Sequence, residues 1–252
     1  MLSKSKVDRI GDKLRRGAVD AEALTRLSEY QSEFDPTYKY VERILTRHMY
    51  LTITGRPAKS TLSIVEKLRR INSRLSQMQD IAGCRTIVLN LSAREDVVRR
   101  AKEWFHSVEV DDKRSRPTHG YRAVHLLVYH GGKCVEVQVR TRIQHFWATV
   151  SEKLSDTYGQ EIKYGEGNEG VRQRLIDLSD NAARFDAAVD ELHANQEQSL
   201  AAKREARGGD FRAFKRKMKS LEKDVREVMY SARSILLEFD KMEAARVLSN
   251  KL

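Results

Sequence analysis

The stretch of sequence that decides the fold occupies residues 124–141 and reads VHLLVYHGGKCVEVQVRT. It contains two runs with strand character, Val124–His130 and Cys134–Thr141, separated by Gly131-Gly132-Lys133. Glycines between two such runs are typical of a hairpin, because glycine adopts the positive φ angles that tight hairpin turns need. We therefore predict two antiparallel strands joined by this turn.

Outward from the hairpin, periodicity and turn residues predict helices before and after a small group of strands. Asp35-Pro36 marks a helix start, since an N-cap residue precedes a proline at the first helical position. Gly55-Arg56-Pro57 should interrupt the chain, and the glycines of residues 159–170 should form a linker. The other expected elements are helical segments over residues 1–54 and 60–78 and short strands over residues 84–89 and 108–110.

The C-terminal part of the chain carries two apolar patterns with helical spacing, separated by Gly208-Gly209. Apolar residues recur in alternating steps of three and four, as in a helix with a narrow apolar seam. Such a seam closes on the neighbouring helix of the same chain or on another subunit, and the sequence leaves both open. The seam positions are Leu175, Leu178, Ala182, Phe185, Val189 and Leu192, then Phe211, Phe214, Met218, Leu221, Val225, Val228, Ala232, Ile235, Phe239 and Met242.

Composition describes a heavily charged globular protein, with 252 residues of which 33% are charged and 40% hydrophobic. No apolar run approaches the roughly 18 residues of a membrane helix, and the start of the chain lacks the apolar region of a secretory signal. The two cysteines, Cys84 and Cys134, are too few for a disulfide scaffold or a cysteine-based zinc site. We therefore expect a cytoplasmic protein without a membrane partner.

The positive charge is concentrated in the middle of the chain, because residues 51–160 contribute eight of the eleven net charges. A basic centre between nearly neutral ends favours a site for a nucleotide or another polyanion. The first 16 residues form a second basic stretch, with six cations against two acids. These cations are Lys4, Lys6, Arg9, Lys13, Arg15 and Arg16.

One face of the helix expected after Ser60 is cationic. On a helical wheel Lys59, Ser63, Lys67 and Arg70 share one stripe, and the apolar residues occupy the opposite side. The unpaired N–H groups at the helix start add to this positive field, so the stripe suits a triphosphate. The alternative is an ordinary solvated face. A P-loop is excluded, because the glycine that should precede the Lys of that motif is missing.

Two carboxylates lie next to or within predicted strands. Asp80 precedes the strand at Cys84–Leu89, and Glu136 alternates with valines in the second strand of the hairpin. Beside a phosphate site, two carboxylates could hold Mg²⁺, which prefers one or two carboxylates together with phosphate oxygens. The alternative is that Glu136 pairs with an arginine on an exposed strand face. A third candidate is Tyr121, which either stacks on a base or simply packs in its loop.

In this order, the motifs resemble the synthetase domain of the RelA/SpoT family, and in size the small alarmone synthetases. The resemblance implies an α+β fold, a nucleotidyltransferase-like mixed β-sheet flanked by helices. It divides the chain into an N-terminal helical segment (1–54), a synthetase core (55–158) and C-terminal helices with the seam (171–252). The motifs are Arg56…Lys59-Ser60…Ser63…Lys67…Arg70, Asp80-Ile81-Ala82-Gly83-Cys84-Arg85, Gly120-Tyr121-Arg122…His125 and Val135-Glu136-Val137-Gln138-Val139-Arg140 with Phe146-Trp147-Ala148.

The resemblance implies transfer of the β,γ-pyrophosphate of ATP to the ribose 3′-hydroxyl of GDP or GTP, which releases AMP. Asp80 and Glu136 would bind Mg²⁺, and Glu136 would orient or deprotonate the attacking hydroxyl. Arg56 and Arg85 would sandwich the adenine, although Arg56-Pro57-Ala58-Lys59 has one residue more than the family's usual Arg-x-Lys. The remaining roles are ATP phosphates for Lys59, Ser63, Lys67 and Arg70, and the acceptor for Tyr121, His125, Gln138, Arg140, Lys113, Arg114 and Arg116.

Alternative acceptors and partners stay open in the sequence. Toxins of this family pyrophosphorylate the 3′ end of tRNA or make adenosine alarmones, and the basic first 16 residues favour an RNA acceptor. A non-enzymatic nucleotide-binding or assembly module is a third hypothesis. No His-Asp dipeptide of the family's hydrolase occurs, so we expect synthesis without hydrolysis. A homo-oligomer through the C-terminal helices and an antitoxin are the expected protein partners.

Overall fold

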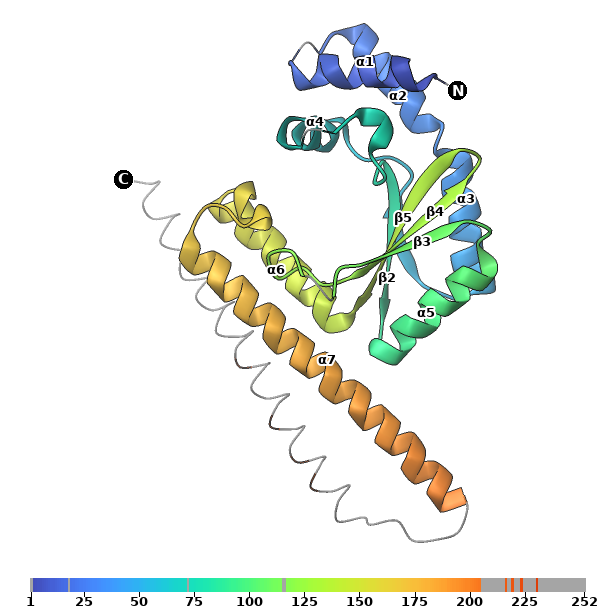
Figure 1. Ribbon diagram of the computed structural model, residues 1–252, viewed down its shortest axis with the longest axis vertical. Coiled ribbons are helices and arrows are strands. Elements are labelled where there is room, and N and C mark those ends of the chain that lie inside the picture. The colour runs from blue at the N-terminus through green and yellow to red at the C-terminus, as the bar shows by residue number, and fades with distance from the viewer. Residues whose placement is uncertain are drawn as a thin grey trace. The chain divides into compact units, whose positions relative to one another are not determined.

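The structure is a computed structural model that describes residues 2–17, 19–71, 73–114 and 117–204 together with residues 216, 219, 223 and 230 (Figure 1). The chain divides into two compact units. Unit 1 consists of residues 1–87, 95–112 and 124–140, and unit 2 consists of residues 88–94, 113–123 and 141–252. Each unit is described by itself below.

Unit 1 is built around a mixed five-stranded sheet with the strand order β1-β2-β5-β4-β3, and this α+β architecture confirms the predicted fold class. The predicted hairpin is present, with Val124 opposite Val139 and Leu126 opposite Val137. Gly131 and Gly132 form its turn with φ angles of 55° and 75°, a region that favours glycine. The strands are β1 (Ile53–Arg56), β2 (Ala82–Val88), β3 (Val108–Asp112), β4 (Val124–His130) and β5 (Lys133–Thr141).

The two faces of the sheet differ in chemistry because side chains alternate along each strand. Val135, Val137 and Val139 of β5 are fully buried on the core face. Glu136 and Gln138 alternate with them and therefore point to the opposite, polar face. Helices α3 and α5 lie on one side of the sheet in Figure 1. The sheet thus separates an apolar core from a surface that carries charged residues.

The helices of unit 1 form where apolar residues repeat with helical spacing. In α1, Val7, Ile10 and Leu14 are buried on one face, as expected for positions three and four residues apart. The helix start predicted at Asp35-Pro36 is present, with the proline in the first turn. The helical elements are α1 (Lys4–Arg15), α2 (Ala21–Ser32), α3 (Asp35–Arg43), a π-helical turn (Ile44–His48), α4 (Thr61–Arg70), a 3₁₀ turn (Leu75–Gln77) and α5 (Leu91–Trp104).

The helix predicted over residues 60–78 is shorter than expected. It ends at Arg70, and Ile71 has extended backbone angles. Side chains of α1 provide the physical reason, because they bind the backbone of this segment. Arg15 Nε donates to the Leu68 carbonyl at 2.9 Å, and the Asp8 carboxylate accepts from the Ser76 N–H at 3.0 Å.

The predicted interruption at Gly55-Arg56-Pro57 is also wrong in part, because Gly55 and Arg56 belong to strand β1. Gly55 lies opposite Cys84 of β2, and a side chain at Gly55 would collide with the Cys84 backbone and Cβ. The glycine therefore permits close approach of two strands. Helix α5 had no prediction, since its apolar positions are few and its exposed face is strongly charged.

Unit 2 consists mainly of two helices whose apolar faces meet. Helices α6 (Arg142–Tyr158) and α7 (Glu169–Arg204) share a core that includes Trp147, Leu154, Leu175 and Leu178. Trp147 Nε1 also donates to the Leu175 carbonyl at 2.7 Å. The first part of the predicted seam therefore packs within the chain. The expected linker instead contains a 3₁₀ helix (Gln160–Tyr164).

The second part of the seam, from Phe211 to Met242, lies outside the described residues. The prediction that it contacts a neighbouring helix or another subunit therefore stays a prediction. Within the described part of the chain, no helix combines the length and the apolar character needed to cross a membrane.

Candidate functional site

The centre of the candidate site is an ion-pair cluster around Asp80. Lys59 Nζ lies 2.7 Å from Asp80 Oδ2, and Lys67 Nζ lies 2.7 Å from Asp80 Oδ1. The three side chains are between 16% and 26% exposed, so solvent screens them only partly. Each carboxylate oxygen therefore has its own lysine, and both lysines converge on one point.

Local backbone contacts hold the two lysines in this position. Ser60 caps α4 by accepting from the Ser63 N–H at 3.3 Å, which fixes the first turn after Lys59. The Lys59 N–H donates to the Ile81 carbonyl at 2.6 Å, which ties this segment to the residue after Asp80. Lys67 lies in the last turn of α4 on a half-buried position. Strand β2 and helix α4 together therefore build the cluster.

The environment of Asp80 keeps its carboxyl group ionised. Burial acts to raise the pKa of Asp80, but the charges and hydrogen bonds of Lys67 and Lys59 outweigh it and hold the pKa below its usual value. A carboxylate that pairs with two ammonium groups neutralises only one of their charges. The cluster therefore has a net positive charge and attracts an anion.

The second carboxylate, Glu136, lies on the polar face of β5 in a chain of hydrogen bonds. His125 Nδ1 lies 2.6 Å from Glu136 Oε1, and Gln138 Nε2 donates to Glu136 Oε2 at 3.3 Å. Arg140 Nη2 donates in turn to Gln138 Oε1 at 2.7 Å. The side chain of Glu136 is only 15% exposed. Both of its oxygens are therefore oriented by neighbouring side chains.

Opposing influences act on the pKa of Glu136. Burial raises it, and the nearby Asp80 carboxylate raises it further, whereas the hydrogen bond and charge of His125 lower it. The net direction is downward, so Glu136 is ionised near neutral pH. The repulsion from Asp80 also shows that the structure brings the two predicted carboxylates into one electrostatic site.

Strand register places the two arginines predicted for adenine on one face of the sheet. Arg85 is paired with Thr54, and Arg56 lies two residues beyond Thr54 on β1. The two arginines are therefore diagonal neighbours, with Cα atoms about 7–8 Å apart in such an arrangement. The extra residue before Lys59 does not remove Arg56 from this face.

Gly83 links the arginine face to Glu136. A Cβ atom built on Gly83 would lie 3.0 Å from the Glu136 carbonyl oxygen and 3.7 Å from the Glu136 Cβ. Since Gly83 and Arg85 are two residues apart on β2, they share a face of the sheet. Glu136 and Arg85 consequently lie on the same face, and only a residue without a side chain fits between them.

The two carboxylates have the donor chemistry for Mg²⁺. No group of three or more His, Cys, Asp or Glu side chains in the described ranges is arranged to hold a metal ion. Mg²⁺, however, takes one or two carboxylates and completes its shell with water and phosphate oxygens. Asp80 and Glu136 fit this requirement, because both are ionised and electrostatically coupled.

The other predicted ATP-site residues lie on α4. The Ser63 hydroxyl accepts from Ser60 Oγ at 2.9 Å, so it lies at the N-terminal turn of the helix. Arg70 is exposed at the last residue of α4. Ser63 and Arg70 therefore mark the two ends of this helix, with Lys67 between them.

The predicted acceptor residues outside the β4–β5 hairpin belong to unit 2. Tyr121 is half-buried and packs against Trp147, with ring centroids 6.1 Å apart. Lys113 and Arg114 are half-buried in the segment before it, and the Arg114 carbonyl accepts from Arg122 Nη1 at 3.2 Å. Arg116 lies outside the described residues.

Sequence reasoning missed two residues that position the site. Gln31 of α2 donates from Nε2 to the Lys59 carbonyl at 2.6 Å. It lies 28 residues before Lys59, and no local pattern signals such a contact. Gly83 was part of a quoted motif but had no role, although a glycine within a strand signals a close approach of other atoms.

Comparisons with known proteins agree with this geometry. Residues 55–161 match the family model described as a region found in RelA/SpoT proteins. An uncharacterized protein of Mycobacterium tuberculosis is 36% identical over 130 residues, which are 50% of this chain and 47% of that protein. The chain thus spans about half the length of the mycobacterial relatives it matches. The GTP pyrophosphokinase YjbM of Bacillus subtilis is 32% identical over 164 residues, which cover 60% of this chain and 75% of the relative.

Solved structures give the same result. The small alarmone synthetase 1 of Bacillus subtilis, bound to its product pppGpp, is 27% identical with a TM-score of 0.56, over 70% of this chain and 98% of that one. A GTP pyrophosphokinase family protein of Streptococcus pneumoniae shares the fold, with 23% identity and a TM-score of 0.54 over 73% of this chain and 98% of the other. From the family model, the 32% identical relative and the shared architecture, it follows that the chain belongs to the RelA/SpoT family.

Proposed function

We propose that the protein transfers the β,γ-pyrophosphate of ATP to the ribose 3′-hydroxyl of GDP or GTP and releases AMP. The observation that carries this proposal is the Lys59–Asp80–Lys67 cluster, with the ionised Glu136 in the same electrostatic site. It combines a cationic phosphate site with a carboxylate that can act on a hydroxyl. We assign the activity to the core of residues 55–158, which the RelA/SpoT model overlaps.

On the donor side, the phosphates of ATP would take the place of Asp80 as partners of the lysines. Lys59 and Lys67 each offer an ammonium group, and the first turn of α4 adds its N–H groups and the Ser63 hydroxyl. Arg70 would contribute a further cation at the other end of the helix. Arg56 and Arg85 would hold the adenine by stacking of their planar guanidinium groups, which their shared face supports.

Asp80, freed from part of its pairing, would hold Mg²⁺ together with Glu136 and phosphate oxygens. When bound, Mg²⁺ neutralises charge on the transferring phosphates. Glu136 would orient the 3′-hydroxyl and accept its proton, a role that needs an ionised carboxylate near neutral pH. Its lowered pKa and its hydrogen bond from His125 support this role.

On the acceptor side, His125, Gln138 and Arg140 extend from Glu136 along the same strands and would bind the acceptor nucleotide. Tyr121 would stack on the acceptor base, and Lys113, Arg114 and Arg116 would meet its phosphates. A guanosine acceptor is supported by two relatives, one named a GTP pyrophosphokinase and one solved with pppGpp as product. We further propose that this chain does not hydrolyse its product and that it forms homo-oligomers through its C-terminal helices.

A second acceptor, the 3′ end of tRNA, is favoured by one observation. Lys4, Lys6, Arg9, Lys13 and Arg16 are exposed on or beside α1 and form a basic surface for an RNA backbone. A toxin with this activity would have an antitoxin as its protein partner. Adenosine nucleotides are the third acceptor class, since a stacked tyrosine accepts any purine.

The experiment that tests the proposal offers each acceptor separately to the full chain with Mg²⁺ and ATP labelled at the γ-phosphate. The acceptors are GDP, GTP, adenine nucleotides and bulk tRNA. The proposal predicts label on GDP or GTP, with unlabelled tRNA and adenine nucleotides. Label on tRNA that declines steeply with salt would replace the guanosine acceptor by RNA. A lack of label on every acceptor would contradict the transfer itself.

A further inference from the structure

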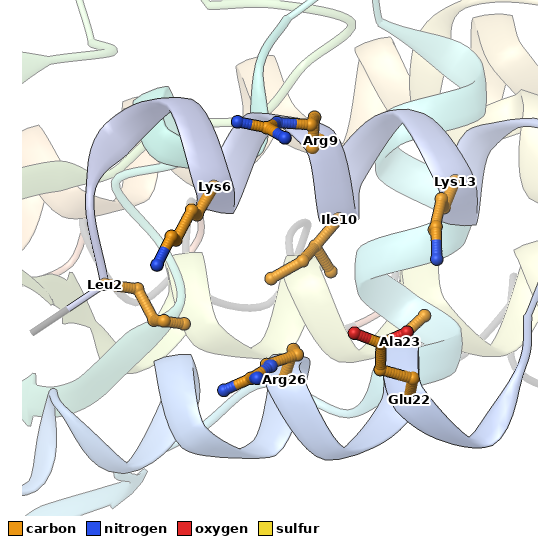
Figure 2. A pocket seen from close by; sticks show the side chains of 8 residues that line it. All are labelled: Leu2, Lys6, Arg9, Ile10, Lys13, Glu22, Ala23 and Arg26. Atoms are coloured by element: carbon orange, nitrogen blue, oxygen red, sulfur yellow. The ribbon is translucent and has the colours of Figure 1, made fainter.

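Helices α1 and α2 enclose a basic hollow that the proposed function does not use. Its volume is about 260 Å³, and its lining residues come from the two helices and the segment before α1 (Figure 2). Figure 2 shows Lys6 and Lys13 directed from α1 toward α2, with Ile10 between the helices. The lining residues are Leu2, Lys6, Arg9, Ile10, Lys13, Glu22, Ala23 and Arg26.

The lining carries four cations and one carboxylate, which gives it a strong positive charge. Two of the cations are already paired, since Lys13 lies 3.3 Å from Asp20 and Arg26 lies 3.0 Å from Glu29. Lys6 and Arg9 have no ion pair with any residue of the described ranges. An uncompensated pair of cations at one hollow is the arrangement that binds an anion.

The spacing of the cations fits a ligand with more than one anionic group. Lys6, Arg9 and Lys13 are separated by three and four residues, so they lie on one face of α1. With a rise of about 1.5 Å per residue, they extend over roughly 10 Å along the helix. One phosphate group would reach only part of this row, whereas phosphates in series would reach several of its members.

The hollow also has a size and a floor that favour a compact ligand. Ile10 and Ala23 are buried apolar residues between the two helices. Its volume lies just below the roughly 300–1,000 Å³ of common small-molecule sites. An extended nucleic-acid strand would instead use all the exposed cations of α1, including Lys4 and Arg16 outside the hollow.

We propose that this hollow binds a compact ligand with two or more phosphate groups in series. The site is separate from the Lys59–Asp80–Lys67 cluster, because it shares no residue with it. Its two helices nevertheless contact the backbone of the catalytic segment. Gln31 of α2 donates to the Lys59 carbonyl, and Arg15 of α1 donates to the Leu68 carbonyl. A ligand that fixes α1 against α2 therefore acts on elements that hold the catalytic lysines.

The test uses isothermal titration calorimetry of the full chain with inorganic tripolyphosphate as the probe. We expect two classes of site in the unmodified protein, one at the catalytic cluster and one at the hollow. The double variant Lys6→Ala/Arg9→Ala should weaken one class at least about tenfold, which corresponds to ~1.4 kcal/mol. Both residues are exposed on a helix, and alanine favours helices, so this variant should fold normally.

The matched control is Lys4→Ala/Arg16→Ala, which removes the same number of charges from the same region but outside the hollow. It should retain both classes of site. A second readout is acetylation of lysine side chains, read by mass spectrometry: tripolyphosphate should protect Lys6 and leave Lys4 reactive.

Three results would overturn the proposal. The first is a single class of site that Lys6→Ala/Arg9→Ala leaves unchanged. The second is equal weakening by both double variants, which would indicate diffuse attraction rather than a site. The third is displacement of tripolyphosphate by a short single-stranded RNA whose affinity also depends on Lys4 and Arg16, which would assign the surface to an RNA backbone. None of these results depends on whether the chain transfers pyrophosphate.

Discussion

Nδ1 of His125 lies 2.6 Å from Oε1 of Glu136, between two neighbouring strands of the sheet. In the register of β4 and β5, His125 is opposite Gln138, and Glu136 is opposite Leu127, so the pair is diagonal. Diagonal neighbours meet only when both side chains point to the same face and one of them is long. The contact supplies the main force that keeps a largely buried carboxylate ionised.

The first prediction concerns the pH dependence of transfer. Glu136 must be deprotonated to act, and its pKa is held below the usual value by His125 against the effect of burial. With His125→Ala, burial and the Asp80 charge remain, so the pKa of Glu136 should rise and the acidic limb of the rate profile should move to higher pH. The measurement is the pH profile of kcat in both proteins.

The control for this prediction is His125→Asn, whose amide can still donate to the carboxylate. It should restore part of the shift toward the wild-type profile. A uniform loss of rate at every pH in His125→Ala, with an unchanged limb, would show that His125 only binds the acceptor.

The second prediction concerns Asp80→Asn. The variant should lower kcat by about 100-fold or more, because the charged partner of Mg²⁺ and of two lysines is lost. It should also destabilise the protein by about 1–3 kcal/mol at neutral pH, since Lys59 and Lys67 lose their common anion. Activity assays and thermal unfolding check the two effects.

The destabilisation should depend on pH in one direction. The folded pKa of Asp80 lies below its ordinary value of 3.8, so its stabilising contribution is complete above that value and is lost as the pH falls through the folded pKa. The difference in Tm between the wild type and Asp80→Asn should therefore shrink in acid. A difference that grows in acid would contradict the ion-pair geometry.

The third prediction concerns the arginines on the sheet face. Arg85→Lys retains the charge but removes the planar group, so KM for ATP should rise about tenfold, from a loss of roughly 1–2 kcal/mol. Arg56→Lys should act similarly if the diagonal pair holds the adenine between them. The specificity for ATP over GTP as donor should fall in both variants. An unchanged donor preference would remove the arginines from the adenine site.

The fourth prediction concerns Gly83. In Gly83→Ala the new methyl group would lie 3.0 Å from the Glu136 carbonyl oxygen, so β5 must shift and the Glu136 carboxylate with it. Such overpacking costs about 1–3 kcal/mol, and kcat should fall more than KM changes. Gly170→Ala, where the nearest atom is 3.4 Å away, is the matched control and should behave as wild type.

The fifth prediction is that the full chain does not break down ppGpp. The family's hydrolase activity depends on a His-Asp pair, and the sequence contains no such dipeptide. Incubation of the protein with ppGpp and Mn²⁺ should leave the nucleotide intact, as followed by anion-exchange chromatography. Breakdown that depends on Mn²⁺ would refute the prediction.

The parts of the fold that follow local rules could be predicted from the sequence. The β4–β5 hairpin depends on Gly131 and Gly132, and the start of α3 depends on Asp35-Pro36, so neighbouring residues determine both. The end of α4 could not be predicted in this way. It depends on Arg15 and Asp8, which lie more than 50 residues away in the chain.

The candidate site shows the same division. The wheel position of Lys59 and Lys67 and the alternation around Glu136 indicate which residues share a face. They do not indicate that both lysines meet Asp80, because that contact depends on how α4 is tied to the residue after Asp80. Strand β1 was hidden for a related reason, since the role of Gly55 is visible only beside Cys84.

The central claim is that the Asp80 and Glu136 site transfers pyrophosphate as a unit. The most direct measurement is ³¹P NMR of the full chain with ATP, GDP and Mg²⁺, which identifies every phosphorus-containing product. We predict equal amounts of AMP and a guanosine nucleotide with a 3′-diphosphate, and neither product with Glu136→Gln. Formation of ADP or free phosphate instead of AMP, or full activity of Glu136→Gln, would contradict the account.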